Sequence, residues 1–314
     1  MKILHLTDTH IGNHLSVQGA PDNWVRGDDH TLAMARALQP ALDGQVDLVI
    51  HSGDLYNRSR PSVRAMQEAS ALLVRVARRV PLVLIPGNHD RWGLARSLPG
   101  GAPGLHVCDA PQRLVFGPLA LALVPFQRRA SAWARAAVRA TGPGVDLLVA
   151  HQAFDGARVP GLTFRVGQQP DTLGEEHLPA GVRHILCGHI HPRQVTQVGA
   201  AQVVQPGSTE RTSFSEADET KGYALWDLGR ELSWRFQDLP SRPMRTLRHP
   251  QDLVGLPPQA LVRLRGLVTR SEALQAGAWV SGRDFRPPVM REPTPQLGLF
   301  GRRTDGSLRP SPSA

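Results

Sequence analysis

The feature that most constrains the fold is the stretch of residues 80–90, where an aliphatic run is followed at once by polar residues. Residues 80–85 read Val-Pro-Leu-Val-Leu-Ile, and such a run is typical of a strand buried on both faces of a sheet. A Pro-Gly pair then ends the strand in a turn. Asn88, His89 and Asp90 follow, and open α/β sheets usually hold their chemistry at such strand ends. The stretch predicts an α/β fold with a functional site here, although a turn with polar caps would fit the same residues.

The rest of the first 90 residues alternates between expected strands and helices. Strands are expected at residues 2–6, 46–50 and 80–85, and helices at 28–43 and 62–79. This β-α-β-α-β order predicts a parallel sheet with right-handed crossovers. Further strands are expected at 105–107, 113–116, 119–124, 145–150, 183–187, 194–198, 201–205, 222–228 and 232–238, with a short helix at 128–140.

Polar residues follow several of these strands. Asp8 and His10 are two residues apart, so in an extended chain they project to the same side and can reach one metal ion. Carboxylate, imidazole and amide ligands without cysteine suit Mn²⁺, Fe²⁺ or Zn²⁺. One carboxylate can bridge two ions roughly 3.5–4 Å apart, and such a pair activates water and neutralises a phosphoryl oxygen. Each residue alone is more often structural, but their recurrence predicts a two-metal site among Asp8, His10, Asp54, Asn88, His89, Asp90, His151, His189 and His191.

These residues resemble the pattern of the calcineurin-like metallophosphoesterases. The matching motifs, within residues 1 to about 192, are Asp8-Thr9-His10, Gly53-Asp54, Gly87-Asn88-His89-Asp90, His151 and Gly188-His189-Ile190-His191. The resemblance implies a four-layer αββα sandwich of two packed sheets flanked by helices. It implies that one ion is held by Asp8, His10, Asp54 and His191, and the other by Asp54, Asn88, His151 and His189. His89 would contact the phosphate and protonate the leaving oxygen, with Asp90 orienting His89.

Within that superfamily the chain is most similar to the DNA repair nucleases of the Mre11/SbcD type. The added similarity lies in residues 6–12, 58–62, 206–211, 214–216 and 221–223, which extend it to about residue 240. This resemblance implies exonucleolytic and endonucleolytic cleavage of DNA in repair or recombination, dependent on Mn²⁺, with Mg²⁺ a further candidate. It also implies a SbcC/Rad50-type coiled-coil ATPase as partner and a homodimer formed through helices of the nuclease domain.

The chain departs from that family in two places. Some relatives carry a histidine three residues after the bridging Asp54, and this chain has Asn57 there, so the phosphate could be oriented differently. The cap that follows the nuclease domain is reduced to residues 241–282, where residues 260–268 alternate in polarity and predict a small β element with a basic face. No amphipathic helix pair follows, and such a pair is what docks on the ATPase coiled coil.

Three segments are therefore expected: a nuclease domain at 1–240, the abbreviated cap at 241–282 and a tail at 283–314. The tail is rich in Pro, Gly, Ser and Arg without periodicity, which predicts disorder. Within it, Gln296-Leu297-Gly298-Leu299-Phe300 resembles the pentapeptide by which bacterial proteins bind the replication sliding clamp. Its leucine and phenylalanine side chains would enter an apolar pocket while the glutamine bonds at the rim. A chance apolar cluster is the alternative.

Charge and cysteine content bear on the partner and the compartment. The formal net charge of +9 and the pI near 10.9 favour a polyanion such as DNA, although a GC-rich genome would also enrich arginine. Cys108 and Cys187 each lie in an apolar run and are predicted to be buried thiols in a reducing compartment. Without a signal peptide or an apolar span long enough to cross a membrane, the chain is expected in the cytoplasm.

The main hypothesis is a two-metal DNA nuclease. A small-molecule phosphodiesterase, acting for instance on cyclic nucleotides, would use the same metals, and a non-catalytic DNA-bound adaptor is a third option. Ionic strength separates the first two, because DNA binding weakens steeply with salt and a small monoanionic substrate responds little. Inactivity with bound metals would favour the adaptor.

Overall fold

The structure, a computed structural model, describes residues 1–13, 28–90, 94–159, 169–248, 252, 255–257, 260–265 and 297–301. The described residues divide into two compact units. The larger unit contains Met1–Asn13, His30–Thr212 and Glu219–Pro240, and the smaller contains residues 28–29, Ser213–Asp218 and the described residues after Pro240. All the residues predicted to bind metal lie in the larger unit.

The first sheet of the larger unit has six strands in the order β12-β11-β1-β2-β3-β4. The strands β1 (Lys2–Leu6), β2 (Leu48–His51), β3 (Leu82–Leu84) and β4 (Leu105–Val107) are parallel neighbours. On the other side of β1, β11 (Lys221–Leu228) and β12 (Leu232–Leu239) are added as antiparallel neighbours. The predicted parallel arrangement is therefore confirmed, and the sheet is mixed because the chain returns to it after residue 220.

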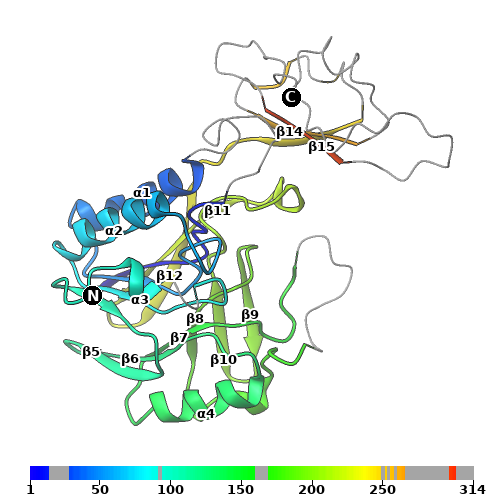
Figure 1. The fold of residues 1–314 in the computed structure, drawn as a ribbon. Helices are drawn as coiled ribbons and strands as arrows, with labels where there is room; N and C mark the ends of the chain where they lie inside the picture. The colour runs from blue at the N-terminus through cyan, green and yellow to red at the C-terminus, as the bar shows by residue number, and fades with distance from the viewer. Residues whose placement is uncertain are drawn as a thin grey trace. The chain divides into compact units, whose positions relative to one another are not determined.

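Two helices cover one face of this sheet (Figure 1). They are α1 (Asp29–Leu42) and α2 (Val63–Ala77), close to the predicted ranges, and α3 (Leu94–Ser97) is a single further turn. α2 begins after Ser62, whose hydroxyl accepts a hydrogen bond from the Ala65 backbone N–H at 3.2 Å and so satisfies one of the free N–H groups of the first turn. The apolar side of both helices packs on the sheet in one buried cluster that includes Leu4, Leu6, Met34, Leu38, Val49, Leu73, Val76 and Leu84.

The second sheet also has six strands, in the order β5-β6-β7-β8-β10-β9. They are β5 (Gln112–Phe116), β6 (Leu119–Val124), β7 (Leu147–His151), β8 (His184–Gly188), β9 (Gln194–Val198) and β10 (Ala201–Gln205). β6, β7, β8 and β10 are parallel neighbours, and the edge strands β5 and β9 are antiparallel. α4 (Ala130–Ala140) covers the outer face, where its fully buried Trp133 packs with residues of β6, β7 and β8.

The two sheets pack against each other through a third buried cluster. It joins residues of the first sheet and of the second: Ile3, Leu48, Ile50, Val83, Leu121, Leu147, Val149 and Leu186. Fully burying an aliphatic side chain of this size contributes about 1.5–3 kcal/mol. Because each sheet carries helices on its outer face and the other sheet on its inner face, the layers are helix, sheet, sheet, helix, which confirms the predicted αββα class.

The smaller unit contains a three-stranded sheet of β13 (Met244–Leu247), β14 (Leu261–Arg265) and β15 (Leu297–Gly301). β14 is the strand expected within residues 260–268. It pairs parallel with β13 and antiparallel with β15. Arg263, expected on a basic outer face, lies with its guanidinium 4.9 Å from the centre of the Phe214 ring and donates to Thr246 Oγ1 at 3.0 and 3.1 Å.

One segment of the predicted tail lies among the described residues. Residues 297–301 form β15, because the backbone of this short apolar segment finds hydrogen-bonding partners along β14. The rest of the range 283–314, including Gln296 of the predicted clamp peptide, lies outside the described residues. The disorder of the tail at 283–314 stays a prediction.

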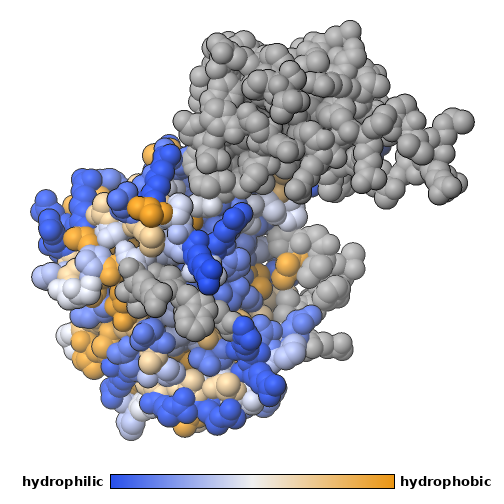
Figure 2. Space-filling view, in the orientation of Figure 1, coloured by the Kyte–Doolittle hydropathy of each residue, from blue (hydrophilic) through white to orange (hydrophobic). Residues whose placement is uncertain are grey.

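The described surface gives a general view of what the larger unit presents to solvent. In the face visible in Figure 2, hydrophobic residues are scattered among hydrophilic ones. Among the described helices, none is long and apolar enough to span a membrane. Cys108 and Cys187 are buried free thiols, as predicted.

Candidate metal centre

The carboxyl end of β7 and the loops that follow β1, β2, β3 and β8 carry the predicted ligands, and they meet at one end of the two sheets. Backbone hydrogen bonds join the first two loops, from Asp8 N–H to the Gly53 carbonyl at 3.0 Å and from His10 N–H to the Asp54 carbonyl at 3.1 Å. The Asp8 carboxylate accepts the backbone N–H of His189, at 3.2 and 3.1 Å, and so ties the first sheet to the second. The parallel strand ends therefore bring distant segments of the chain together.

The backbone is strained at this end of the sheets. Among the described residues, the non-glycine residues with positive φ are Asp8 at 49°, His10 at 46°, Asp54 at 55° and His189 at 89°. Each such conformation costs about 1–3 kcal/mol and persists only where the surroundings impose it. All of them were predicted as metal ligands, and strain of this kind is concentrated at functional sites.

One group of side chains consists of Asp8, His10 and His191, whose ligand atoms all lie within 4.8 Å of one another. The Nε2 atoms of His10 and His191 are 3.0 Å apart, and each lies 3.9 Å from Asp8 Oδ1. Two nitrogens bound at right angles to one ion, at about 2.1 Å each, would be roughly 3.0 Å apart. The spacing of the two rings therefore fits a shared ion.

A second group is centred on Asp54 and includes His151, Asn88 and His189. Asp54 Oδ2 lies 3.4 Å from His151 Nε2 and 3.8 Å from His10 Nε2, so it stands between the two groups. Asn88 Oδ1 lies 2.8 Å from His189 Nδ1 and 3.2 Å from His151 Nε2. Asp8 also belongs with Asp54 and His151, since their ligand atoms lie within the same 4.8 Å limit. A carboxylate between two ligand sets is the arrangement that a metal pair needs.

The histidine tautomers suit metal binding as well. His151 Nδ1 lies 2.7 Å from the Ser52 carbonyl oxygen, which can only accept, so Nδ1 carries a proton and the neutral ring offers its lone pair at Nε2. The His191 ring is oriented by a contact between Nδ1 and Thr212 Oγ1 at 3.0 Å, which leaves Nε2 facing the centre. The residues present therefore fit a pair of divalent cations.

His89 lies at the open side of this cluster. Its side chain is 41% exposed, Nε2 is 4.0 Å from Asp54 Oδ2, and Nδ1 donates to the Asn57 carbonyl oxygen at 2.7 Å. The backbone N–H of His89 donates to Asp54 Oδ1 at 2.8 Å. Asn57 therefore orients the His89 ring through its main chain.

Asp90 does not orient His89 as expected. Its buried carboxylate accepts the backbone N–H groups of Leu55, Tyr56 and Gly87, each at 3.0 Å. Burial, and after it the negative charge of Asp54, raise the pKa of Asp90 to about 6. The side chain turns toward the backbone because these N–H groups would otherwise be buried without a partner. Asp90 thus joins the loop after β2 to the loop after β3.

A model of the calcineurin-like phosphoesterase family matches residues 1–193. The chain belongs to this family. Among the curated proteins it resembles, DNA double-strand break repair protein Mre11 of Methanosarcina mazei is 29% identical over 254 residues, which are 75% of this chain and 38% of that protein. The SbcD subunit of the nuclease SbcCD from Rhodobacter capsulatus is 28% identical over 322 residues, 84% of this chain and 75% of that protein.

The likeness has limits of length and of identity. This chain spans 38% of the Methanosarcina mazei protein and 61% of Mre11 of Thermoplasma acidophilum, to which it is 28% identical. Among solved structures, a dimetal phosphatase from Danio rerio matches with a TM-score of 0.50 at 10% identity, over 76% of this chain and 98% of that one. That match supports the metallophosphoesterase fold.

Electrostatics within this phosphoesterase centre favour an ionised Asp54 and neutral rings of His10 and His189. Burial acts to raise the pKa of Asp54, but the rings of His151, His10 and His89 together outweigh it and hold that pKa far below the usual value. Burial lowers the pKa of His10 well below its usual value and that of His189 to about 3. For His151, burial is opposed by the Asp54 carboxylate, which raises the pKa to about 9. A cation that binds here would displace the His151 proton.

Two glycines let the loops approach closely. Gly53 has a φ of 104°, and a Cβ there would overlap the His151 ring. A Cβ at Gly87 would overlap the Asp54 carboxylate. Both motifs of the family pattern therefore contain a glycine because a side chain would displace a ligand.

Other residues of the centre were not singled out from the sequence. Thr9 Oγ1 lies 3.0 Å from His51 Nε2 and donates to the Leu55 carbonyl at 3.1 Å, so it links two ligand loops. The Phe126 ring lies with its centre 5.7 Å from that of His189 and forms an aromatic wall beside the ligands. Phe126 follows the end of β6, so the strand-end rule could have found it; nothing in the sequence marks the Thr9 contact.

Proposed function

We propose that this chain is a two-metal DNA nuclease that hydrolyses phosphodiester bonds in DNA repair or recombination. The observation that carries the proposal is the position of Asp54 Oδ2, 3.8 Å from His10 Nε2 and 3.4 Å from His151 Nε2, between two ligand groups. The names of the Mre11 and SbcD relatives support DNA as the substrate.

The proposed ligand sets follow from the two groups. Asp8, His10, Asp54 and His191 would hold one ion, and Asp54, Asn88, His151 and His189 the other. Two ions bound there supply Lewis acidity, which activates water and neutralises charge on the phosphoryl oxygens. The mixed oxygen and nitrogen donors suit Mn²⁺, with Fe²⁺, Zn²⁺ and Mg²⁺ as alternatives.

His89 is proposed to be the catalytic residue for the leaving group. Because Nδ1 is occupied by the Asn57 carbonyl, the ring presents Nε2 on the side of Asp54 and of the open surface. From there it can contact the phosphate and, when both ring nitrogens carry a proton, pass the Nε2 proton to the departing oxygen while Nδ1 keeps its own, a contribution of roughly 10²–10⁴-fold in rate. Asp90 supports this indirectly, since it holds the loops that carry Asp54 and Asn88.

Exposed arginines next to the centre support a polyanionic substrate. Arg58 and Arg60 follow Asn57, and Arg128 and Arg129 follow Phe126, so both loops beside the ligands carry exposed cations. With a net charge of +9, these arginines favour contact with successive phosphates of a DNA strand. Binding through several phosphates predicts a steep loss of affinity as salt rises.

The direct test is Mn²⁺-dependent cleavage of end-labelled single-stranded and double-stranded DNA, with Asp54→Ala as the control. We expect cleavage by the wild-type chain and none by the control. His89→Gln should lose cleavage while keeping its Mn²⁺ content. Turnover of a nitrophenyl phosphodiester without any cleavage of DNA would contradict the proposed substrate and favour a small-molecule phosphodiesterase.

We also propose partners for the chain. The Rhodobacter relative is named as one subunit of a nuclease, which supports a second subunit, such as a SbcC/Rad50-type ATPase, for this chain. Homodimer formation and clamp binding through Gln296, Leu297, Leu299 and Phe300 stay predictions. Sedimentation of the purified chain, alone and with a sliding clamp, would test both.

A further inference from the structure

The segment that follows β10 and the start of β11 contain residues that the proposed reaction does not use. They include Ser208 and Lys221, which belong to the segments that resemble the Mre11/SbcD type. Lys221 is the first residue of β11, and only 1% of its surface is exposed. Lysine is almost never buried this completely unless its ammonium is bound by other groups.

The Lys221 ammonium contacts the backbone of a proposed metal ligand. Nζ donates to Ser208 Oγ at 2.8 Å and to the His191 carbonyl oxygen at 3.3 Å. The Ser208 backbone N–H donates to the same carbonyl at 3.1 Å. Two donors therefore converge on His191, one from β11 and one from the segment after β10.

The same contacts reach the other side of the ligand group. Ser208 forms an isolated parallel bridge with Thr7, which immediately precedes Asp8. Gly207 has a φ of 79°, and a Cβ there would overlap the His191 carbonyl. The segment thus passes close to His191 on one side and to Thr7, the residue before Asp8, on the other.

The identity of the cation is informative in this chain. Of its 36 lysine and arginine residues, two are lysine, Lys2 and Lys221. A buried site between a hydroxyl and a carbonyl suits a compact ammonium with three donors, whereas the larger planar guanidinium needs more room. A general preference for arginine therefore does not explain the residue at this position.

We propose that Lys221 is a positioning residue for His191. Its ammonium fixes the His191 main chain so that Nε2 stays 3.0 Å from His10 Nε2, the spacing that suits a shared ion. The inference rests on the proposed metal centre, because it assumes that His191 is a ligand. Partners that orient a ligand typically change metal affinity by about 10–100-fold when they are removed.

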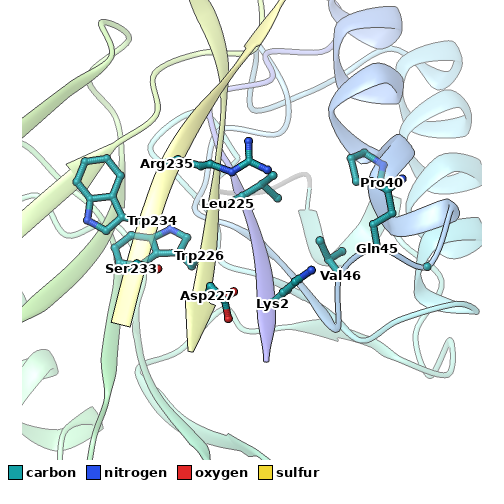
Figure 3. A pocket seen from close by; sticks show the side chains of 11 residues that line it. Lys2, Pro40, Gln45, Val46, Leu225, Trp226, Asp227, Ser233, Trp234 and Arg235 are labelled. Atoms are coloured by element: carbon teal, nitrogen blue, oxygen red, sulfur yellow. The ribbon is translucent and has the colours of Figure 1, made fainter. Parts of the chain in front are cut away.

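The test compares Mn²⁺ binding to the metal-stripped full-length chain by isothermal titration calorimetry. Lys221→Met keeps the length of the side chain and removes the ammonium. It should lower the affinity of the chain for one of the two ions by about 10–100-fold. The other ion should bind as in the wild type. Lys2→Met is the matched control. Lys2 lies at the start of β1 and lines a surface pocket with Gln45 and Val46 (Figure 3). Its replacement should leave the affinity for both ions unchanged.

A double variant separates positioning from a general loss of structure. In the His191→Ala background, where the affected ion has already lost a ligand, Lys221→Met should leave the affinity for the remaining ion unchanged. A defect of the whole fold would weaken that ion too, and this outcome would overturn the inference. Ser208→Ala removes the hydroxyl that accepts a hydrogen bond from the ammonium at 2.8 Å, without adding bulk. It should lower the affinity for the same ion by a smaller factor.

Two further results would separate a failure of the proposed role of Lys221 from a failure of the proposed ligand set. If Lys221→Met and Ser208→Ala bind both ions like the wild type while His191→Ala loses one, the inference about Lys221 fails and the ligand set stands. If His191→Ala also binds both ions normally, the ligand set fails, and the inference fails with it.

Discussion

Thr9→Val tests the hydrogen bonds that hold two of the ligand loops together. Thr9 is fully buried, and its hydroxyl lies between His51 Nε2 at 3.0 Å and the Leu55 carbonyl oxygen at 3.1 Å. Burial lowers the pKa of His51 to about 3, so the ring is neutral at pH 7. Its Nδ1 accepts the Gly53 N–H at 3.3 Å, so Nε2 carries the proton and donates to Thr9, which donates to Leu55.

The expected loss of stability follows from the hydrogen bonds of the Thr9 hydroxyl, which valine cannot make. Valine keeps the shape of threonine but leaves the buried His51 N–H without an acceptor, at a cost of about 1–3 kcal/mol. The lost hydrogen bond to Leu55 adds about 0.5–1.5 kcal/mol. The Leu55 carbonyl keeps the Ile11 N–H at 2.9 Å, so it is not left unsatisfied. We therefore expect the free energy of unfolding to fall by about 2–4 kcal/mol.

Urea unfolding of the metal-free chain, followed by circular dichroism, measures this loss. Thr9→Ser is the matched control, because it keeps the hydroxyl and removes one methyl group, which is worth about 0.8 kcal/mol. If valine and serine at this position lowered the free energy of unfolding equally, the hydroxyl would not stabilise the loops and the reasoning would be refuted.

Three further predictions concern packing and titration in the larger unit. Gly87→Ala should lower the Mn²⁺ affinity measured by calorimetry, because the Cβ of the alanine would displace the Asp54 carboxylate. Unchanged affinity would show that the loop moves to accommodate the methyl group. Trp133→Ala should lower the free energy of unfolding in urea by about 3–5 kcal/mol, since Trp133 is fully buried under the second sheet. Burial lowers the pKa of His5 to about 3, so this neutral ring stabilises the fold above its unfolded pKa of 6.5, and that stability is lost as the pH falls from 6.5 toward 3. His5→Gln should therefore reduce the acid-side slope by up to about 1.4 kcal/mol per pH unit; an unchanged slope would mean that His5 is charged in the folded chain.

The proposed ligands were predictable because of where they stand in the chain. Asp8, Asp54 and Asn88 follow buried strands, and parallel strands place their carboxyl ends at one edge of a sheet. The aliphatic runs before them also fixed the layers, because strands with two apolar faces require cover on both sides. Pattern and spacing were sufficient for these residues because the chemistry depends on side-chain types.

Residues that act through the main chain were not predictable. His89 is oriented by the carbonyl of Asn57, and any residue type at position 57 has that carbonyl. The Asp90 carboxylate turned to three backbone N–H groups because the loop geometry left them unsatisfied, which no spacing rule expresses. Lys221 meets His191 across 30 positions of sequence, a contact that only the folded chain shows. The sequence thus predicted the proposed ligands, and the fold was needed to find which groups position them.

The central claim is that Asp54 stands between two metal ions. A crystal of the chain soaked in Mn²⁺, with anomalous diffraction recorded near the manganese edge, tests it most directly. We expect two peaks roughly 3.5–4 Å apart, both in contact with the Asp54 carboxylate. A single peak, or two peaks of which one does not contact Asp54, would contradict it.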